Sequence, residues 1–254
     1  MRKIALVVEY EGTRYHGSQF QGNVPTIQDE IERALSRLTG ERIRIICASR
    51  TDVGVHAQGQ VVGFNTNSNL PPDTFVRALN HYLPPDIAVR KAFRVSDAFD
   101  VRKNACSREY CYRLLNSPTA SPLLRGSAYF VPKPLDVATM NEACQALLGT
   151  HDFAPFASAL NGRRNTVRTV YRAEVTREGE LVTFYMVANS FLPHQVRNTI
   201  GALVKVGLGK SDVESFRQIA CSKTPAAAGP ALPARGLCLM KVNYPNDGAW
   251  HEDL

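Results

Sequence analysis

The sequence lacks the usual signs of a metal site, a secreted protein or a membrane protein. Its six cysteines form no Cys-x-x-Cys pair, and no histidines stand at zinc-finger spacing. The apolar run near the amino terminus is broken at Glu9, too early for the core of a signal peptide. No apolar stretch approaches the roughly 20 residues of a membrane-spanning helix. These absences predict a cytoplasmic protein with reduced thiols, no metal and no membrane partner.

The charge of the chain points to a polyanionic partner. Its 30 Lys and Arg residues against 23 Asp and Glu give a net charge of +7. Such an excess favours nucleic acid first and an acidic membrane second, although many basic proteins bind neither. The sequence has no glycine-rich phosphate-binding loop, so a nucleotide cofactor is not expected.

The first half of the chain alternates between strand and helix patterns. Thr26 is a candidate helix cap, and Gly40 is a candidate stop for the same helix. The predicted order is β-α-β-β-α-β, the ferredoxin-like unit. The expected strands are 4–10, 42–48, 60–66 and 87–95, and the expected helices are 26–38 and 72–83.

The second half repeats this style of organisation. The expected strands are 110–115, 128–131, 167–176, 181–189 and 237–244, and the expected helices are 136–148, 193–208 and 212–220. We therefore predict an α+β protein made of two ferredoxin-like halves. Each half would have an antiparallel sheet with helices on its outer face, and a cleft would lie between the halves. The predicted boundary lies near Asn104, which gives domains 1–104 and 105–254.

One aspartate, Asp52, stands in a polar loop between two predicted strands. Loops held by a rigid sheet often carry catalytic groups, and Gly54 can supply a backbone angle that other residues resist. A carboxylate there can act as a nucleophile, a general base or an electrostatic partner. On position alone, a turn aspartate that bonds to its own backbone is the more common explanation.

The pattern around this aspartate, R-T-D-x-G-V-H followed by G-Q-V-V-G-F, resembles the signature of TruA-type tRNA pseudouridine synthases. Further resemblances follow in the family's order along nearly the whole chain. They are E-Y-E-G-T-R-Y-H-G, L-P-P-D-I-A-V-R, F-D-V-R, S-R-E-Y-C-Y, H-D-F-A-P-F, F-L-P-H-Q-V-R-N and G-L-C-L-M-K-V-N-Y-P. Each piece is weak alone, but their order and spacing are specific.

The resemblance implies an isomerase that converts uridine to pseudouridine at positions 38 to 40 of the tRNA anticodon arm. The glycosidic bond breaks, the base rotates, and a carbon–carbon bond forms in its place, so no cofactor is implied. The family also implies a homodimer, in which one subunit docks the tRNA elbow while the other acts. Residues 1–104 would then bind RNA and carry the catalytic loop, and residues 105–254 would form the catalytic domain.

The resemblance assigns roles to five residues. Asp52 matches the essential aspartate, and Arg197 matches the arginine that pairs with it. Tyr110 matches the tyrosine that packs on the target base, and Leu237 matches an apolar residue beneath that base. Arg50 matches the arginine that fills the space left by the everted base. Such an arginine would offset part of the cost of base extrusion, which is a few kcal/mol. From local pattern alone, a core strand residue is the better explanation for Tyr110, and Leu237 is expected to be a core residue as well.

Arginines elsewhere are candidates for a phosphate-binding track. For any single member, a solvated charged face is an equally good explanation. The candidates are Arg14, Arg77, Arg102, Arg108, Arg163, Arg164, Arg168 and Arg172, of which Arg14, Arg164 and Arg168 are the main substrate-binding predictions.

The sequence departs from the family pattern at several places. Ser18 and Phe20 stand where the family usually has Trp and Arg, which puts the preferred position within the anticodon arm in doubt. Ser49 replaces a usual Gly, and Gln195 replaces a common Met. His56 has no family role, and we expect it to satisfy nearby backbone groups.

Two other functions fit parts of the pattern. A non-catalytic RNA-binding protein on the same fold would read RNA through aromatic residues on its sheet, but the known aromatic signature of such modules is missing. A glycoside hydrolase would need a second acid near Asp52, for which Glu9 and Glu11 are candidates by position only.

Overall fold

The computed structural model describes residues 1–158, 160 and 165–245 of the chain. The fold divides into two compact units, one of Met1–Arg108 with the segment from Leu239 onward, and one of Glu109–Cys238. Two strands, β5 (Ser107–Asn116) and β10 (Leu237–Asn243), contribute residues to both units. We describe each unit by itself.

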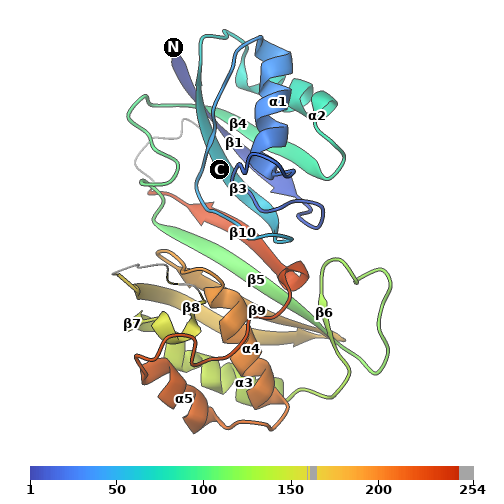
Figure 1. Cartoon of the computed structure of the whole chain (residues 1–254), viewed down its shortest axis with the longest axis vertical. Coiled ribbons are helices and arrows are strands. Elements are labelled where there is room, and N and C mark those ends of the chain that lie inside the picture. The colour runs from blue at the N-terminus through green and yellow to red at the C-terminus, as the bar shows by residue number, and fades with distance from the viewer. Residues whose placement is uncertain (159, 161–164, 246–254) are drawn as a thin grey trace. The chain divides into compact units, whose positions relative to one another are not determined.

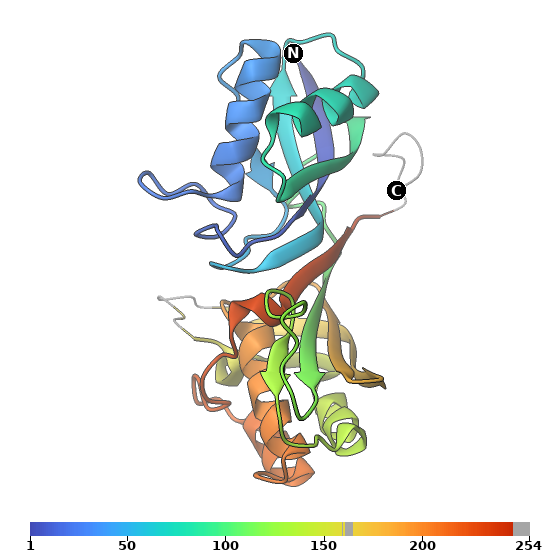
Figure 2. The ribbon, with the colours of Figure 1, turned by 90° about the vertical axis from the view of Figure 1, so that its right-hand side faces the viewer.

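The first unit has the predicted β-α-β-β-α-β order. Its elements are β1 (Arg2–Tyr10), α1 (Ile27–Thr39), β2 (Ile46–Cys47), β3 (His56–Thr66), α2 (Pro72–Tyr82) and β4 (Ile87–Val95). The sheet order is β4-β1-β3-β10, with β2 also paired to β3. The pairs β1–β3, β1–β4 and β2–β3 are all antiparallel. Figures 1 and 2 show α1 and α2 on the same face of this sheet.

Helix α1 follows the sequence signals closely. The side chain of Thr26 accepts a hydrogen bond from the backbone N–H of Asp29, which caps the first turn. Gly40 ends the helix with a φ of 72°, the left-handed conformation that favours glycine. Ile27 and Leu35 lie on its buried face. The prediction of a helix from 26 to 38 is confirmed.

The predicted strand 42–48 is wrong over most of its length. Only Ile46–Cys47 pairs with β3. Side chains of α1 take the backbone groups that a sheet partner would otherwise use. The N–H of Ile45 donates to Glu32 Oε1 at 3.0 Å, and Gln28 Nε2 donates to the carbonyl of Ile45 at 3.4 Å. The segment is thus anchored to the helix rather than extended as a strand.

Strand β3 begins four residues earlier than the predicted strand 60–66, at His56. Gly59 explains part of the close packing along this strand. A Cβ at Gly59 would lie 2.4 Å from the carbonyl oxygen of Met240 on β10, so only glycine fits there. In helix α2, Phe75 and Leu79 are buried, and Phe75 packs on the ring of Phe64 with centroids 5.7 Å apart.

The second unit is also a mostly antiparallel sheet with helices, but it does not copy the first. Besides β5, its elements are β6 (Tyr129–Val131), α3 (Val137–Cys144), a 3-10 turn (Gln145–Leu147), β7 (Gly149–Asp152), β8 (Val167–Glu178), β9 (Leu181–Ala188), α4 (Gln195–Gly207) and α5 (Val213–Cys221). The strand order is β5-β9-β8-β7, with β6 paired in parallel to β5. Helices α3, α4 and α5 pack together over this sheet (Figure 1).

Three details of the second unit differ from the sequence predictions. Strand β7 was not predicted. The hairpin between β8 and β9 is tighter than expected, because only Gly179 and Glu180 lie in its turn. Helix α4 begins at Gln195 and not at the predicted Pro193, because His194 has a φ of 60°, which a right-handed helix does not allow. The α+β class and the mostly antiparallel sheets are confirmed.

In the part of the chain that the structure describes, no helix combines the length and the apolar character needed to cross a bilayer. All six cysteines are free thiols, and Cys111 and Cys144 are buried in the second unit.

Candidate active site

Asp52 lies in the first unit, in the loop between β2 and β3. We call residues 49–55 the aspartate loop. The N–H of Val55 donates to the carbonyl of Asp52 at 3.2 Å, and Gly54 adopts a φ of 75° inside this turn. The side chain of Asp52 is half-buried. The loop is therefore a defined turn at the entry to a long strand.

The motif E-Y-E-G-T-R-Y-H-G packs directly on the aspartate loop, and two glycines make this possible. A Cβ at Gly12 would lie 2.0 Å from the carbonyl oxygen of Val55. A Cβ at Gly17 would lie 2.8 Å from the carbonyl oxygen of Thr51, and Gly17 has a φ of 90°. Two motifs far apart in the sequence thus form one packed structure that only glycine permits.

His56 satisfies the backbone of the same motif, as expected. The N–H of Gly12 donates to His56 Nδ1 at 3.0 Å, and the ring is buried. Glu11 Oε1 approaches the same nitrogen at 3.7 Å.

Arg50, in the aspartate loop, and Arg14, predicted for the phosphate-binding track, differ in the contacts of their side chains. Arg50 is exposed. Arg14 is also exposed, and its Nε donates to Asp86 Oδ2 at 2.7 Å. The Asp86 carboxylate raises the pKa of Arg14. Asp86 also accepts from the Tyr15 hydroxyl at 2.6 Å, and burial together with this bond raises the pKa of Tyr15.

In the second unit, Tyr110 and Arg197 are placed by different means. Tyr110 lies on β5 and is buried, and its ring meets Phe191 edge-on with centroids 5.0 Å apart. Arg197 lies in the first turn of α4, and its Nε donates to the carbonyl of Leu232 at 2.6 Å. The N–H of Leu232 donates back to the carbonyl of Arg197 at 3.2 Å. Leu237 opens β10 and is buried.

Residues 226–234, A-A-A-G-P-A-L-P-A, form the loop that contains Leu232, and a second contact anchors this loop in the second unit. The hydroxyl of Tyr112 donates to the carbonyl of Pro233 at 2.7 Å. A Cβ at Gly236 would lie 2.6 Å from the Tyr112 ring, so the chain passes against the ring face. Burial raises the pKa of Tyr112. The loop that receives Arg197 is therefore fixed in position.

The phosphate-binding track stays a prediction. Arg163 and Arg164 lie outside the described residues. Arg168 is half-buried and donates to the carbonyl of Val167 at 2.6 Å. Arg108 is buried and does not fit a phosphate contact. Its guanidinium donates to the carbonyls of Ala48, Arg102 and Ala105.

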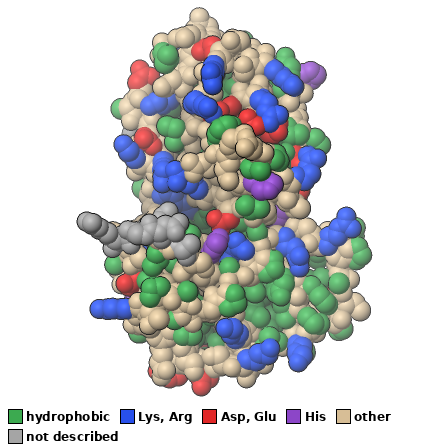
Figure 3. Space-filling model, in the orientation of Figure 1, with side chains coloured by type: hydrophobic (Ala, Val, Ile, Leu, Met, Phe, Trp, Pro, Cys, Tyr) green, Lys and Arg blue, Asp and Glu red, His purple; other side chains and the backbone are tan. Residues whose placement is uncertain are grey.

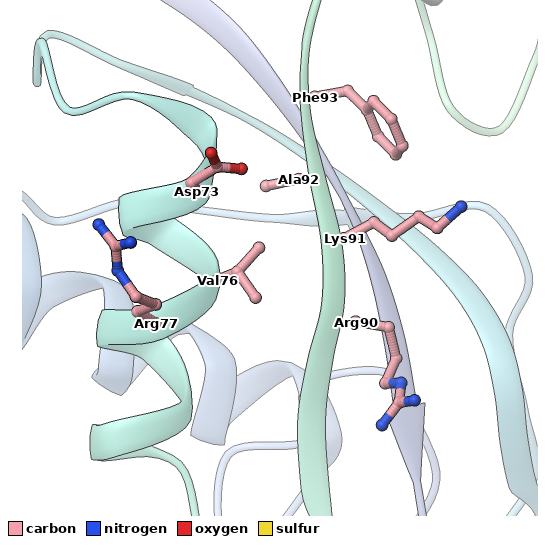
Figure 4. Close-up of a pocket in the computed structure, with 7 residues that line it drawn as sticks. All are labelled: Asp73, Val76, Arg77, Arg90, Lys91, Ala92 and Phe93. Atoms are coloured by element: carbon pink, nitrogen blue, oxygen red, sulfur yellow. The ribbon is translucent and has the colours of Figure 1, made fainter. Parts of the chain in front are cut away.

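A groove of about 380 Å³ runs between α2 and β4 in the first unit, and it holds none of the predicted catalytic residues. Figure 4 shows that its cations do not converge. Arg77 points away from β4, and Lys91 leaves the strand on the side opposite Ala92. In the first unit, the visible face in Figure 3 also carries Lys and Arg mixed with acidic side chains. No anion site is evident in this groove.

No group of three or more His, Cys, Asp or Glu side chains suited to a metal ion occurs within residues 1–158, 160 and 165–245.

Sequence reasoning named the aspartate but missed the groups that hold its loop. Tyr10, Ser18 and Gln60 are buried polar residues of the first unit that contact the aspartate loop. A buried Gln in an apolar strand pattern was the available signal.

Comparisons with known proteins agree with the sequence motifs. A family model described as tRNA pseudouridine synthase matches residues 6–102 and 143–245. A tRNA pseudouridine synthase A of Acetivibrio thermocellus is 43% identical over 244 residues, which cover 96% of this chain and 100% of that protein. One from Roseiflexus castenholzii is 46% identical over 252 residues, which cover 98% of this chain and 93% of that protein.

One solved structure, titled as a crystal structure of a Cbf5-Nop10-Gar1 complex, covers 82% of this chain and 55% of its own at 14% identity. Its TM-score of 0.32 is too low to bear on the fold or the function. The family model and the full-length relatives do not depend on that likeness. The chain belongs to the tRNA pseudouridine synthase family, whose members are isomerases.

Proposed function

We propose that this protein converts uridine to pseudouridine at positions 38 to 40 of the tRNA anticodon arm, in the cytoplasm. Family membership carries the proposal, because the chain matches relatives named tRNA pseudouridine synthase A over 93% and 100% of their length. The placement of Asp52 supports it. This carboxylate stands in a turn fixed by glycine packing, where a catalytic group keeps its direction.

The reaction rearranges bonds within one nucleotide. The bond from uracil N1 to the ribose carbon breaks, the base rotates, and a bond from C5 to the same carbon forms. The C5 proton is released and N1 gains a proton, so the product is an isomer and no redox partner is needed. Asp52 takes part by adding to the base, by attacking the sugar carbon or by assisting a glycal intermediate.

The other predicted residues serve this step. By resemblance to the family, Arg197 is the proposed partner of the Asp52 carboxylate, and a guanidinium is well suited to bind a carboxylate. Tyr110 packs on the everted uracil, and Leu237 supports the base from below. Arg50 fills the space in the tRNA stack, which offsets part of the cost of base extrusion.

Binding of tRNA beyond the target nucleotide rests on charge. Arg14 and Arg168, together with Arg164 outside the described residues, contact the phosphate backbone, in keeping with the net charge of +7. The active form is a homodimer, in which the second subunit holds the tRNA elbow.

The test uses tRNA labelled with tritium at uridine C5. The wild-type protein is expected to release tritium, and Asp52→Asn is expected to release it at least about 10³-fold more slowly while binding tRNA normally. Release by Asp52→Asn at the wild-type rate would refute the role of this aspartate. If the wild type binds tRNA but releases no tritium from any tRNA, the protein is an RNA-binding protein rather than a synthase.

A further inference from the structure

The backbone of Ser49, on one side of Arg50, is held by a buried side chain. The N–H of Ser49 donates to Gln60 Oε1 at 3.2 Å, and Gln60 Nε2 donates to the carbonyl of Ser49 at 2.7 Å. Gln60 lies on β3 and is fully buried. Its carboxamide thus holds the Ser49 backbone at both the N–H and the carbonyl, just beyond the end of β2.

The backbone of Thr51, on the other side of Arg50, is held in the same two-point manner. The N–H of Thr51 donates to Ser18 Oγ at 2.9 Å, and the N–H of Ser18 donates to the carbonyl of Thr51 at 3.1 Å. Ser18 is fully buried. Ser18 departs from the family pattern, and its hydroxyl has a structural partner in the aspartate loop.

The hydroxyl of Tyr10 connects these two contacts. It lies 2.8 Å from Thr51 Oγ1 and 3.4 Å from Gln60 Nε2. The side chains of Tyr10, Ser18, Thr51 and Gln60 are all buried. Because hydrogen bonds are stronger and unpaired polar groups more costly in such surroundings, a satisfied network of this kind is rigid. We call Tyr10, Ser18 and Gln60 the loop clamp.

We propose that the loop clamp positions Arg50 and Asp52 for the reaction, and that Gln60 is its principal positioning residue. This inference rests on the proposed function. The backbone of Ser49 and of Thr51 is fixed at both the N–H and the carbonyl. Arg50 and Asp52 are bonded directly to Thr51, so the fixed backbone limits the directions in which their side chains can point. None of the three clamp residues needs to touch the substrate. A displacement of about 1 Å at a reacting group costs about 10²-fold in rate, so the clamp sets kcat more than tRNA affinity.

The main test compares Gln60→Leu with Thr66→Val. Both residues are fully buried polar groups on β3, but Thr66 is the last residue of the strand, and its hydroxyl bonds Glu41 Oε1 at 2.7 Å and the N–H of Ser68 at 3.1 Å. Single-turnover rates are measured with saturating full-length enzyme and tritiated tRNA, along with tRNA Kd and Tm. Gln60→Leu is expected to lose about 10²-fold in rate with Kd changed less than about threefold. Thr66→Val is expected to keep its rate within about twofold despite a comparable loss of Tm.

Two smaller deletions keep the test decisive if Gln60→Leu fails to fold. Tyr10→Phe and Ser18→Ala each remove a single hydroxyl and are expected to lower the single-turnover rate about tenfold, again with little change in Kd. Rates that follow Tm alone, with the clamp variants no slower than Thr66→Val, would overturn the proposal. That outcome differs from failure of the proposed function, in which the wild type itself releases no tritium.

Discussion

The two units hold their candidate catalytic residues in opposite ways. In the first unit, buried residues hydrogen-bond to the backbone of the aspartate loop. Gln60 bonds to both the N–H and the carbonyl of Ser49, and Ser18 bonds to both the N–H and the carbonyl of Thr51. In the second unit, a backbone loop receives the side chain, since the carbonyl of Leu232 accepts from Arg197. A catalytic carboxylate on a short loop needs external support, whereas an arginine on a helix has its backbone fixed already.

The largest effect is expected at Gly12, where the first unit has no space for a side chain. Gly12→Ala places a Cβ 2.0 Å from the carbonyl oxygen of Val55, so the aspartate loop and the segment around Gly12 must move apart. We expect a loss of about 3 kcal/mol in unfolding free energy and nearly complete loss of tritium release. The measurements are denaturant unfolding and single-turnover rates.

The matched control is Gly22→Ala, because a Cβ at Gly22 meets no atom within 4 Å. It is expected to change the unfolding free energy by no more than about 0.5 kcal/mol. Equal effects at the two glycines would show that close packing on the aspartate loop is not what Gly12 provides.

A smaller effect is expected in the second unit from Arg197→Lys. The ammonium keeps the charge but loses the planar guanidinium that donates to the Leu232 carbonyl and, in the proposed reaction, would bind the Asp52 carboxylate. We expect single-turnover rates to fall about 30-fold, or about 2 kcal/mol, with stability lowered only slightly. Single-turnover assays and thermal unfolding measure the two effects.

Arg177→Lys is the comparison for that variant. Arg177 donates to Asn116 Oδ1 at 2.7 Å and to the carbonyl of Leu135 at 3.1 Å, so it too holds backbone in the second unit. Its replacement is expected to lower Tm without slowing the reaction. If both variants slow the reaction equally, the role of Arg197 is structural.

The smallest expected effect is a difference in acid sensitivity between the capped helix ends of the two units. Helix α1 has a neutral cap, Thr26, while α3 and α5 are capped by Asp136 and Asp212. Hydrogen bonds from backbone N–H groups lower the pKa of both aspartates. Their stabilisation is therefore present above the unfolded pKa of about 3.9 and is lost as pH falls through the lower folded pKa.

Hydrogen exchange between pH 5 and pH 2.5 is the measurement. After correction for intrinsic rates, amides in the first turns of α3 and α5 are expected to lose more protection on acidification than those of α1. Asp136→Asn and Asp212→Asn keep the cap without the titrating group, and are expected to remove the difference. Equal loss in all three helices would contradict this account.

Local signals predicted most of the fold, and contacts between distant segments account for what was missed. Thr26 and Gly40 mark the ends of α1 correctly because helix caps are local. Strand 42–48 was overpredicted because α1 side chains, far from it in the sequence, take its backbone groups. Strand β7 was missed because four residues, G-T-H-D, show no apolar alternation.

The same division applies to the site. Asp52 was identified because its motif is contiguous, and the glycines around it were part of quoted motifs. The loop clamp was not identified, since the bond between Ser49 and Gln60 joins residues 11 apart by a side chain. Ser18 was treated as a simple departure from the family pattern, because a fully buried serine cannot be told from an exposed one by its letter.

The most direct measurement is a map of pseudouridines in tRNA from cells with and without this gene. We predict that pseudouridine at positions 38 to 40 disappears without the gene. It should return when the wild-type protein is supplied, but not when Asp52→Asn is supplied. Unchanged pseudouridine at those positions in the absence of the gene, or its full recovery with Asp52→Asn, would contradict the account.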